Sequence, residues 1–266
     1  VERVLSGHLL VEPSVDGQSV GWFIFDTGAG SMVIDPEVAD ELGMPELGEV
    51  LTVGIGGKAT ASFRKGKRFD LGPLELSDPT YVELDLSFLE AIFGRKIAGI
   101  VGYDLLARCV AEIETATPYI ALHDPAHFTL TNGSWQDLIL CHNTPCTRAR
   151  FEGEREGLFR LDTGANGTVA FHAPAVVALG LLDGRKVTSS QAGGVGGLAE
   201  SKEGQLAWFE LAGHRFEKPA VSFSQATTGA FTDRYTTGNI AQDFLAPFRM
   251  VLDYPHDRIA FVKRGK

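Results

Sequence analysis

The sequence predicts an all-β protein of two lobes related by a pseudo-twofold axis, with a few short helices. Three observations predict this fold class. The first is composition: 31 Gly and 12 Pro are spread along 266 residues, which indicates many turns and short strands rather than long helices. The second is the local pattern, in which short apolar runs alternate with turn residues. The third is an internal repeat that covers most of the chain.

The composition also excludes several classes of protein. Hydrophobic residues make up 44% and charged residues 22% of the chain, as in ordinary globular proteins, which excludes a disordered chain. The apolar runs are shorter than the ~20 residues that cross a bilayer, so we expect no membrane span. The net charge of −10 repels phosphate backbones, and we therefore expect no nucleic-acid partner.

The repeat consists of six landmarks that recur in the same order, roughly 136 to 140 residues apart. The most informative landmark is Asp-Thr-Gly-Ala, which begins at Asp26 and again at Asp162. The others include a helical pattern that ends in Leu-Gly, a glycine-rich turn and a Gly-x-x-x-x-Asp segment. A duplicated unit of about 120 residues accounts for all of them. We expect an N-terminal lobe over 1–123, a linker over 124–148 and a C-terminal lobe over 149–266.

The elements of each copy follow from these landmarks in order. Two short apolar segments lead into each Asp-Thr-Gly, and a short helix follows it. In the first copy Asp35 is a favourable N-cap and Pro36 suits the first helical turn. We expect strands at 4–11, 20–25, 110–113, 119–122, 137–141, 147–151, 157–161, 249–252 and 258–262, and a further short helix at 86–93.

The two Asp-Thr-Gly motifs predict a catalytic pair. Each aspartate follows an apolar strand at an equivalent point, so Asp26 and Asp162 are expected to meet across the axis. Two carboxyl groups within hydrogen-bonding reach share one proton over a broad pH range. The ionised member can take a proton from a water molecule while the protonated member donates to the carbonyl that is attacked.

The residues after each aspartate are expected to support the pair. The hydroxyl groups of Thr27 and Thr163 can anchor the two loops, and Gly28 and Gly164 let the backbone turn tightly, which brings amide groups near the carboxylates. The alternative interpretation is that both aspartates only cap turns, since Asp-x-Gly is common turn chemistry.

On these motifs the chain resembles the pepsin-like aspartic proteases, and more closely their retroviral-type (retropepsin-like) branch, in a fused two-copy form. Tyr103 and Gln242 stand where retroviral proteases usually carry an Arg in the late element. The resemblance implies that both glycine-rich turns are flap tips that hold an extended peptide; an ordinary hairpin turn without flap function stays open. The tip residues are Gly54, Ile55, Gly56 and Gly57 in the first copy, and Gly194, Val195, Gly196 and Gly197 in the second.

The resemblance implies an aspartic endopeptidase that cleaves an extended polypeptide, needs no cofactor or metal and is active as a monomer. A catalytically silent peptide-binding module on the same fold is the alternative from another class. An acid hydrolase that acts on non-peptide substrates would share the same pair. Both motifs are followed by Ala, where most pepsins have a hydroxyl residue. We therefore predict a raised pKa of the pair and an activity optimum nearer pH ~5–7 than the strongly acidic range.

The three cysteines do not decide whether the protein works in an oxidising or a reducing compartment. Cys141 and Cys146 could close a small disulfide loop, stay free thiols or, with His142, ligate a metal, whereas Cys109 is expected to be buried. The possible disulfide and the start at Val1 without an initiator Met favour a periplasmic or secreted protein, with the cytoplasm as the alternative.

Overall fold

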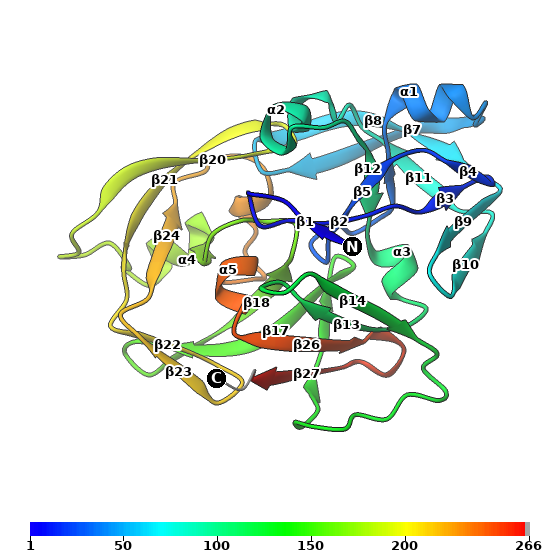
Figure 1. Cartoon of the computed structure of the whole chain (residues 1–266). Helices are drawn as coiled ribbons and strands as arrows, with labels where there is room; N and C mark the ends of the chain where they lie inside the picture. Colours follow the sequence, from blue (N-terminus) through cyan, green and yellow to red (C-terminus); the bar gives the residue numbers. More distant parts are fainter. Residues whose placement is uncertain (264–266) are drawn as a thin grey trace.

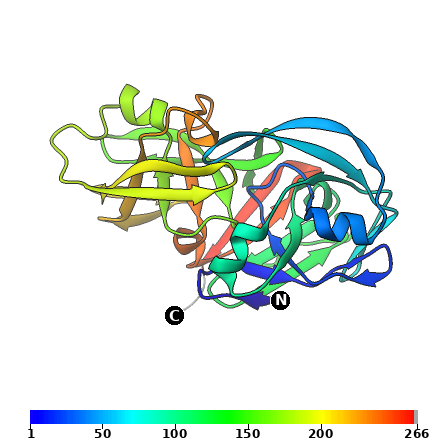
Figure 2. The same ribbon diagram turned by 90° about the horizontal axis from the view of Figure 1, so that it is seen from above.

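The computed structural model describes residues 1–263 and consists mostly of β-strands (Figure 1). This confirms the predicted all-β fold class. The helices are short, and the longest α-helices among the described residues, α1 (Pro36–Glu41) and α4 (Ala173–Ala178), have six residues each. Seen from above, the N-terminal half in blue and cyan and the C-terminal half in green to orange form two lobes side by side (Figure 2).

The first half of the chain supplies the following elements, in chain order: β1 (Glu2–Arg3), β2 (Leu9–Val11), β3 (Ser14–Val15), β4 (Gln18–Ser19), β5 (Trp22–Phe25), β6 (Val33–Ile34), α1, β7 (Glu46–Gly54), β8 (Gly57–Lys65), β9 (Arg68–Leu71), β10 (Leu74–Ser77), β11 (Thr80–Glu83), η1 (Ser87–Leu89), α2 (Glu90–Phe93), β12 (Ile97–Val101), α3 (Tyr103–Leu106), β13 (Val110–Glu114), β14 (Tyr119–His123) and β15 (Gln136–Asp137).

The second half supplies these elements: β16 (Ile139–Cys141), β17 (Thr144–Phe151), β18 (Arg155–Asp162), β19 (Val169–Phe171), α4, β20 (Thr188–Gly194), β21 (Gly197–Gln205), β22 (Trp208–Leu211), β23 (His214–Glu217), β24 (Ala220–Ser224), η2 (Ala230–Thr232), β25 (Gly238–Ala241), α5 (Gln242–Leu245), β26 (Phe248–Asp253), η3 (Tyr254–His256) and β27 (Arg258–Lys263).

The two lobes build their main sheets in the same strand order over seven strands, from β7 to β2 and from β20 to β17, and the sheets differ beyond these strands. The N-terminal sheet runs β7-β8-β11-β6-β12-β5-β2-β1, and the C-terminal sheet runs β20-β21-β24-β19-β25-β18-β17-β22-β23. In each sheet the strand that leads into Asp-Thr-Gly, β5 or β18, pairs in parallel with a later strand, β12 or β25. The two aspartates therefore end equivalent strands of the two sheets.

A third sheet joins the two halves beneath the lobes (Figure 1). Its order is β14-β13-β26-β27-β15, so one hairpin from each half lies next to the other. The predicted hairpins β13–β14 and β26–β27 are confirmed. Their pairing through β13 and β26, from Val110 opposite Asp253 to Glu114 opposite Arg249, was not predicted. Residue patterns show which segments are strands but do not show which strands become neighbours.

Several elements differ in extent from the prediction. The first strand is interrupted by a turn, in which the N–H of Gly7 donates to the carbonyl of Val4 at 2.8 Å and Gly7 has φ +92°. Of the strand expected at 4–11, only β2 forms, antiparallel to β5, and His8 just before it is buried. The helix expected at 86–93 is divided into η1 and α2. In the second half, β17 begins at Thr144, within the segment predicted as a linker.

One continuous apolar core underlies both lobes. It extends from Phe25 in the N-terminal lobe, through Ile113 and Leu252 in the shared sheet, to Phe159 and Phe223 in the C-terminal lobe. Because this core crosses the lobe boundary, it holds the ends of β5 and β18 in a fixed relation. Of the helices within residues 1–263, none has the length and apolar character needed to cross a membrane.

Candidate active site

Asp26 and Asp162 lie next to each other between the lobes. The N–H of Asp26, directly after β5, donates to the carbonyl of Val101 on β12 at 3.0 Å. Asp162 is the last residue of β18 and pairs with Ala241 on β25. The carboxyl groups of the two aspartates are within hydrogen-bonding reach. The structure thus brings together the pair that the repeated motif predicts.

The two threonines interlock the loops. The N–H of Thr27 donates to Thr163 Oγ1 at 3.0 Å, and the N–H of Thr163 donates to Thr27 Oγ1 at 3.1 Å. The Thr27 hydroxyl then donates to the carbonyl of Leu161 at 2.7 Å, and the Thr163 hydroxyl donates to that of Phe25 at 3.0 Å. Both threonine side chains are fully buried. Four reciprocal hydrogen bonds therefore tie the lobes together directly beneath the carboxyl groups.

The two glycines let each loop approach the carboxyl group of the other lobe. The N–H groups of Gly28 and Gly164 both donate to Asp26 Oδ1, at 2.6 and 3.1 Å. A Cβ at Gly28 would lie 2.6 Å from Asp162 Cγ, and a Cβ at Gly164 would overlap Asp26 Cγ. Neither neighbour is a flexible side-chain end that could move away without disturbing the pair.

We expect Gly164→Ala to lower peptide-cleaving activity by about 10²-fold or more, because the new methyl group displaces Asp26 and a shift of about 1 Å is enough to cost that factor. The measurement is kcat/KM on one cleaved peptide, with the melting temperature recorded beside it. A folded Gly164→Ala protein with wild-type kcat/KM would contradict this role of the glycine.

The electrostatics of the pair favour one bound proton. Burial, together with the charge of Asp162, raises the pKa of Asp26 to about 8. Burial also raises the pKa of Asp162, but the Arg160 charge and hydrogen bonds from backbone amides and the Asn239 side chain oppose that rise. The raised pKa agrees in direction with the prediction. Its cause here is burial and mutual repulsion.

The structure adds polar residues that the sequence analysis missed. Asn239 Nδ2 donates to Asp162 Oδ2 at 3.0 Å, and His172 Nε2 lies 3.0 Å from Asn239 Oδ1. His8 Nε2 lies 2.9 Å from the carbonyl oxygen of Gly164. His8 and His172 are both buried. A comparison of the two copies in register would have revealed Asn239, because the first copy has an apolar residue there.

The late Gly-x-x-x-x-Asp elements support the loops after each Asp-Thr-Gly. Asp104 and Asp243, at equivalent positions, accept N–H groups from those loops. The N–H groups of Tyr103 and Gln242 donate to carbonyl groups of the same loops. These bonds hold the loops at the positions where retroviral proteases usually use an Arg.

The predicted flap tips are the turns of two long hairpins that meet. The last pairs are Gly54 with Gly57 in β7–β8 and Gly194 with Gly197 in β20–β21. The N–H of Gly56 donates to the carbonyl of Val195 at 3.0 Å, so one tip contacts the other backbone to backbone (Figure 2).

Glycine is required at this contact. A Cβ at Gly54 or Gly56 would overlap the backbone of Val195 or Gly196. A loop that precedes η2 forms a third contact, because a Cβ at Gly229 would overlap the carbonyl oxygen of Ile55. This third contact was not predicted, since nothing in the repeat marks that loop.

These loops and hairpins have a counterpart in a known family. Residues 11–105 match the aspartyl protease family model. The match runs from the end of β2 to α3 and includes Asp26, its Thr-Gly neighbours and the β7–β8 hairpin. A search of curated proteins gives no match to this chain. The N-terminal lobe is thus similar to the aspartyl proteases, and together with the all-β fold this supports an aspartyl protease and a peptidase activity.

The thiol and metal alternatives can be placed on the structure. Cys109, Cys141 and Cys146 are free thiols, and Cys109 is buried as predicted. Burial raises the pKa of the Cys109 thiol to about 12, so this thiol stays protonated. Within residues 1–263 no group of three or more His, Cys, Asp or Glu side chains is placed to hold a metal ion.

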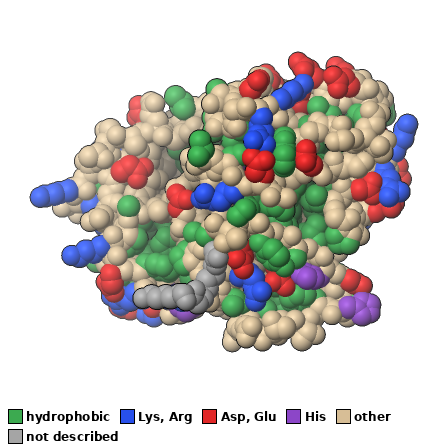
Figure 3. Space-filling view, in the orientation of Figure 1, with side chains coloured by type: hydrophobic (Ala, Val, Ile, Leu, Met, Phe, Trp, Pro, Cys, Tyr) green, Lys and Arg blue, Asp and Glu red, His purple; other side chains and the backbone are tan. Residues whose placement is uncertain are grey.

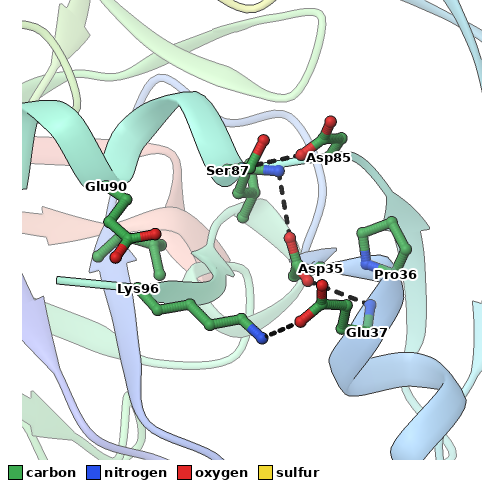
Figure 4. Close-up of a pocket in the computed structure, with 9 residues that line it drawn as sticks. Asp35, Pro36, Glu37, Asp85, Ser87, Glu90 and Lys96 are labelled. Carbon is green, nitrogen blue, oxygen red and sulfur yellow. Dashed lines mark hydrogen bonds and ion pairs between the residues drawn. The ribbon is translucent and has the colours of Figure 1, made fainter.

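A separate cavity of about 430 Å³ lies beside α1 (Figure 4). Asp35 there caps the helix as predicted, since its carboxylate accepts the N–H of Glu37 at 3.1 Å and that of Leu86 at 3.2 Å. Lys96 forms an ion pair with Glu37. Asp35, Glu37 and Lys96 are thus engaged with neighbours in the cavity wall, and none of the predicted site residues lines the cavity.

A run of basic residues occupies positions 64–68, at the turn from β8 to β9. Its two arginines each lie beside two carboxylates: Asp40 and Glu83 for Arg64, and Asp70 and Glu75 for Arg68. On the face shown in Figure 3, basic side chains lie among acidic ones and form no continuous positive patch.

Proposed function

We propose that the protein is a retropepsin-like aspartic endopeptidase built from two fused copies of one unit, with Asp26 and Asp162 as its catalytic residues. The observation that carries this proposal is the reciprocal Asp-Thr-Gly arrangement. Each loop places its glycine against the other lobe's carboxyl group, and the threonine side chains interlock beneath. Aspartates that only cap turns would need neither the glycine contacts nor the threonine interlock. The common strand order of the two sheets supports the two-copy interpretation.

The chemistry follows from a pair that shares one proton. A water molecule held between the carboxyl groups attacks the peptide carbonyl carbon. The ionised aspartate takes a proton from that water, and the protonated aspartate donates its proton to the carbonyl oxygen. The tetrahedral intermediate collapses when the aspartate that took the water proton passes it to the amide nitrogen, which leaves as the amine, while the other aspartate recovers a proton from the hydroxyl group of the intermediate. The raised pKa of Asp26 keeps one proton on the pair up to about pH 8, which supports activity near neutral pH.

The two glycine-tipped hairpins would act as flaps over an extended peptide. Their tips contact each other, so a substrate must separate them before it reaches the pair. Both lobes, with boundaries proposed at 1–123 and 149–266 and a linker between them, belong to one chain. Because that chain supplies both halves of the pair, we propose that the monomer is active.

Cleavage of a diverse peptide library between pH 3 and 8 tests the proposal, with the wild type and Asp162→Asn measured in parallel. We expect cuts by the wild type alone, most of them at pH ~5–7, and the cleaved bonds then report the subsite preferences. Equal cuts by both proteins would mean that Asp162 does not catalyse the cleavage and would overturn the proposal. No cuts by a folded wild type that still binds peptides would overturn the proposal in favour of a silent peptide-binding module.

A further inference from the structure

The two lobes differ in the side chains that precede their aspartates on β5 and β18 and in the side chains paired with them on β12 and β25. On the Asp26 side, Ile24 of β5 pairs with Ile100 of β12, and both belong to a buried apolar cluster. On the Asp162 side, the same register positions of β18 and β25 hold Arg160 and Asn239. The residue two positions before each aspartate, together with its partner on the neighbouring strand, is therefore apolar in the N-terminal lobe and polar in the C-terminal lobe.

Asn239 presents an N–H donor to one aspartate only. Its Nδ2 donates to Asp162 Oδ2 at 3.0 Å, while its Oδ1 lies 3.0 Å from His172 Nε2. An amide oxygen can only accept, so this contact requires the proton on His172 Nε2. Burial, with the nearby Arg160 charge, lowers the pKa of His172 to about 4, so the ring is neutral at physiological pH and has a single N–H. That N–H directs the NH₂ group of Asn239 toward Asp162.

The polar chain continues behind His172 and returns to β18. Thr236 Oγ1 lies 3.1 Å from His172 Nδ1 and 2.6 Å from Asp233 Oδ2. Asp233 in turn forms an ion pair with Arg160. The side chains of His172 and Thr236 are almost fully buried, and those of Arg160 and Asp233 are only 13% and 10% exposed. The single proton of the Thr236 hydroxyl goes to Asp233 Oδ2, so His172 Nδ1 only packs against Thr236 Oγ1, and the burial of these side chains limits their rearrangement.

The groups around the two carboxyls are correspondingly unequal. Asp162 is faced by Asp26 from the other lobe, by the Arg160 charge from its own strand and by the Asn239 amide from β25. Asp26 is faced by Asp162 and accepts the N–H groups of Gly28 and Gly164, both at Oδ1. A protonated Asp26 can keep both of those bonds with its proton on Oδ2.

We propose that Asn239, held in orientation by His172, is a positioning residue that keeps Asp162 ionised and so leaves the shared proton on Asp26. This inference rests on the proposed function and assigns the two roles within it. Asp162 takes the proton from the attacking water, and Asp26 donates its proton to the peptide carbonyl oxygen as the new C–O bond forms.

Titration of the aspartate carboxyl carbons by ¹³C NMR tests the assignment without any substrate. With one member of the pair removed, Asp162 in Asp26→Asn should titrate at a lower pH than Asp26 in Asp162→Asn. Adding Asn239→Leu, which has nearly the size of Asn but no donor, to Asp26→Asn should raise the Asp162 titration by about one to two pH units. His172→Phe should also raise the pH at which Asp162 titrates, but by less than Asn239→Leu, because the Asn239 amide remains and only loses its orientation.

Ile100→Leu in the Asp162→Asn background is the matched control, since it alters packing beside Asp26 without touching a donor, and it should leave the Asp26 titration in place. Where the wild type cleaves peptides, the acid limb of its kcat/KM profile should move up in pH in Asn239→Leu by a similar amount. An unshifted Asp162 titration in folded Asn239→Leu and His172→Phe proteins would overturn the proposal. Absence of cleavage by the wild type would overturn only the proposed function, because the titration requires no activity.

Discussion

Asp26→Asn should lower kcat/KM by about 10³-fold or more, because the Asn amide cannot transfer the proton that the peptide carbonyl oxygen needs. Binding of an uncleaved peptide should persist, since Asn has the shape of Asp and its Oδ1 can still accept the N–H groups of Gly28 and Gly164. The measurement is kcat/KM together with peptide affinity. Asp70→Asn, which removes only an exposed ion pair with Arg68, is the control that should keep wild-type kcat/KM.

The same variant should change the pH dependence of folding stability. The pKa of Asp26 rises from an ordinary 3.8 when unfolded to about 8 when folded. The unfolded chain therefore releases this proton at lower pH than the folded chain. The contribution of this group to stability is fully present below about pH 4, is lost as the pH rises to about 8, and does not change further above that pH. Asp26→Asn removes the loss, so its melting temperature should exceed that of the wild type by an amount that grows across this window.

Two results would contradict this account of Asp26. One is substantial peptide cleavage by Asp26→Asn that Asp162→Asn shares, which would place the chemistry elsewhere. The other is a difference in melting temperature that stays constant between pH 4 and 8, which would mean that the pKa of Asp26 is not raised by folding.

Thr27→Val should destabilise the protein by about 2–5 kcal/mol and reduce activity with it. The substitution keeps the size of the side chain but removes the hydroxyl group. It leaves the carbonyl of Leu161 and the N–H of Thr163 buried and unpaired, and each orphaned group costs about 1–3 kcal/mol. The measurement is urea unfolding followed by circular dichroism. Thr27→Ser retains the hydroxyl and is the matched control that should stay within about 1 kcal/mol of the wild type.

Because the bonds between Thr27 and Thr163 are reciprocal, we also expect the effects of substituting the two threonines to be coupled. Thr163→Val should cost a similar amount, and the double variant should cost clearly less than the sum, because both hydrogen bonds of each hydroxyl group go to the other lobe and the four bonds form one interlock. Additive losses, or a Thr27→Val protein as stable as Thr27→Ser, would show that the interlock does not hold the lobes together.

Much of the site could be predicted because its motifs occur in both halves of the chain. Asp-Thr-Gly recurs after an apolar strand in each half, and the glycine-rich turns recur in register, so Asp26, Asp162 and both hairpin tips were found from spacing alone. The terminal hairpins β13–β14 and β26–β27 were also found, because a hairpin joins neighbours in the sequence. The cap of α1 at Asp35 needed only local chemistry.

What could not be predicted depends on contacts between segments far apart in the chain. The shared sheet exists because β13 and β26 become neighbours, and no residue pattern specifies that pairing. The turn at Gly7 directs His8 inward to the carbonyl of Gly164, where a strand had been expected. The contact of Gly229 with the tip of the β7–β8 hairpin joins two loops that share no sequence pattern.

The sequence by itself determined the all-β class, the repeated unit and the two aspartates, because these depend on local pattern and on similarity between the copies. Only the tertiary structure decided that the two aspartates are unequal. Their motifs are the same, and the difference comes from Asn239, His172 and Arg160, which folding brings behind one carboxyl group alone. A carboxyl pKa depends on the donors and charges within a few ångströms, and those neighbours are set by how the strands pack.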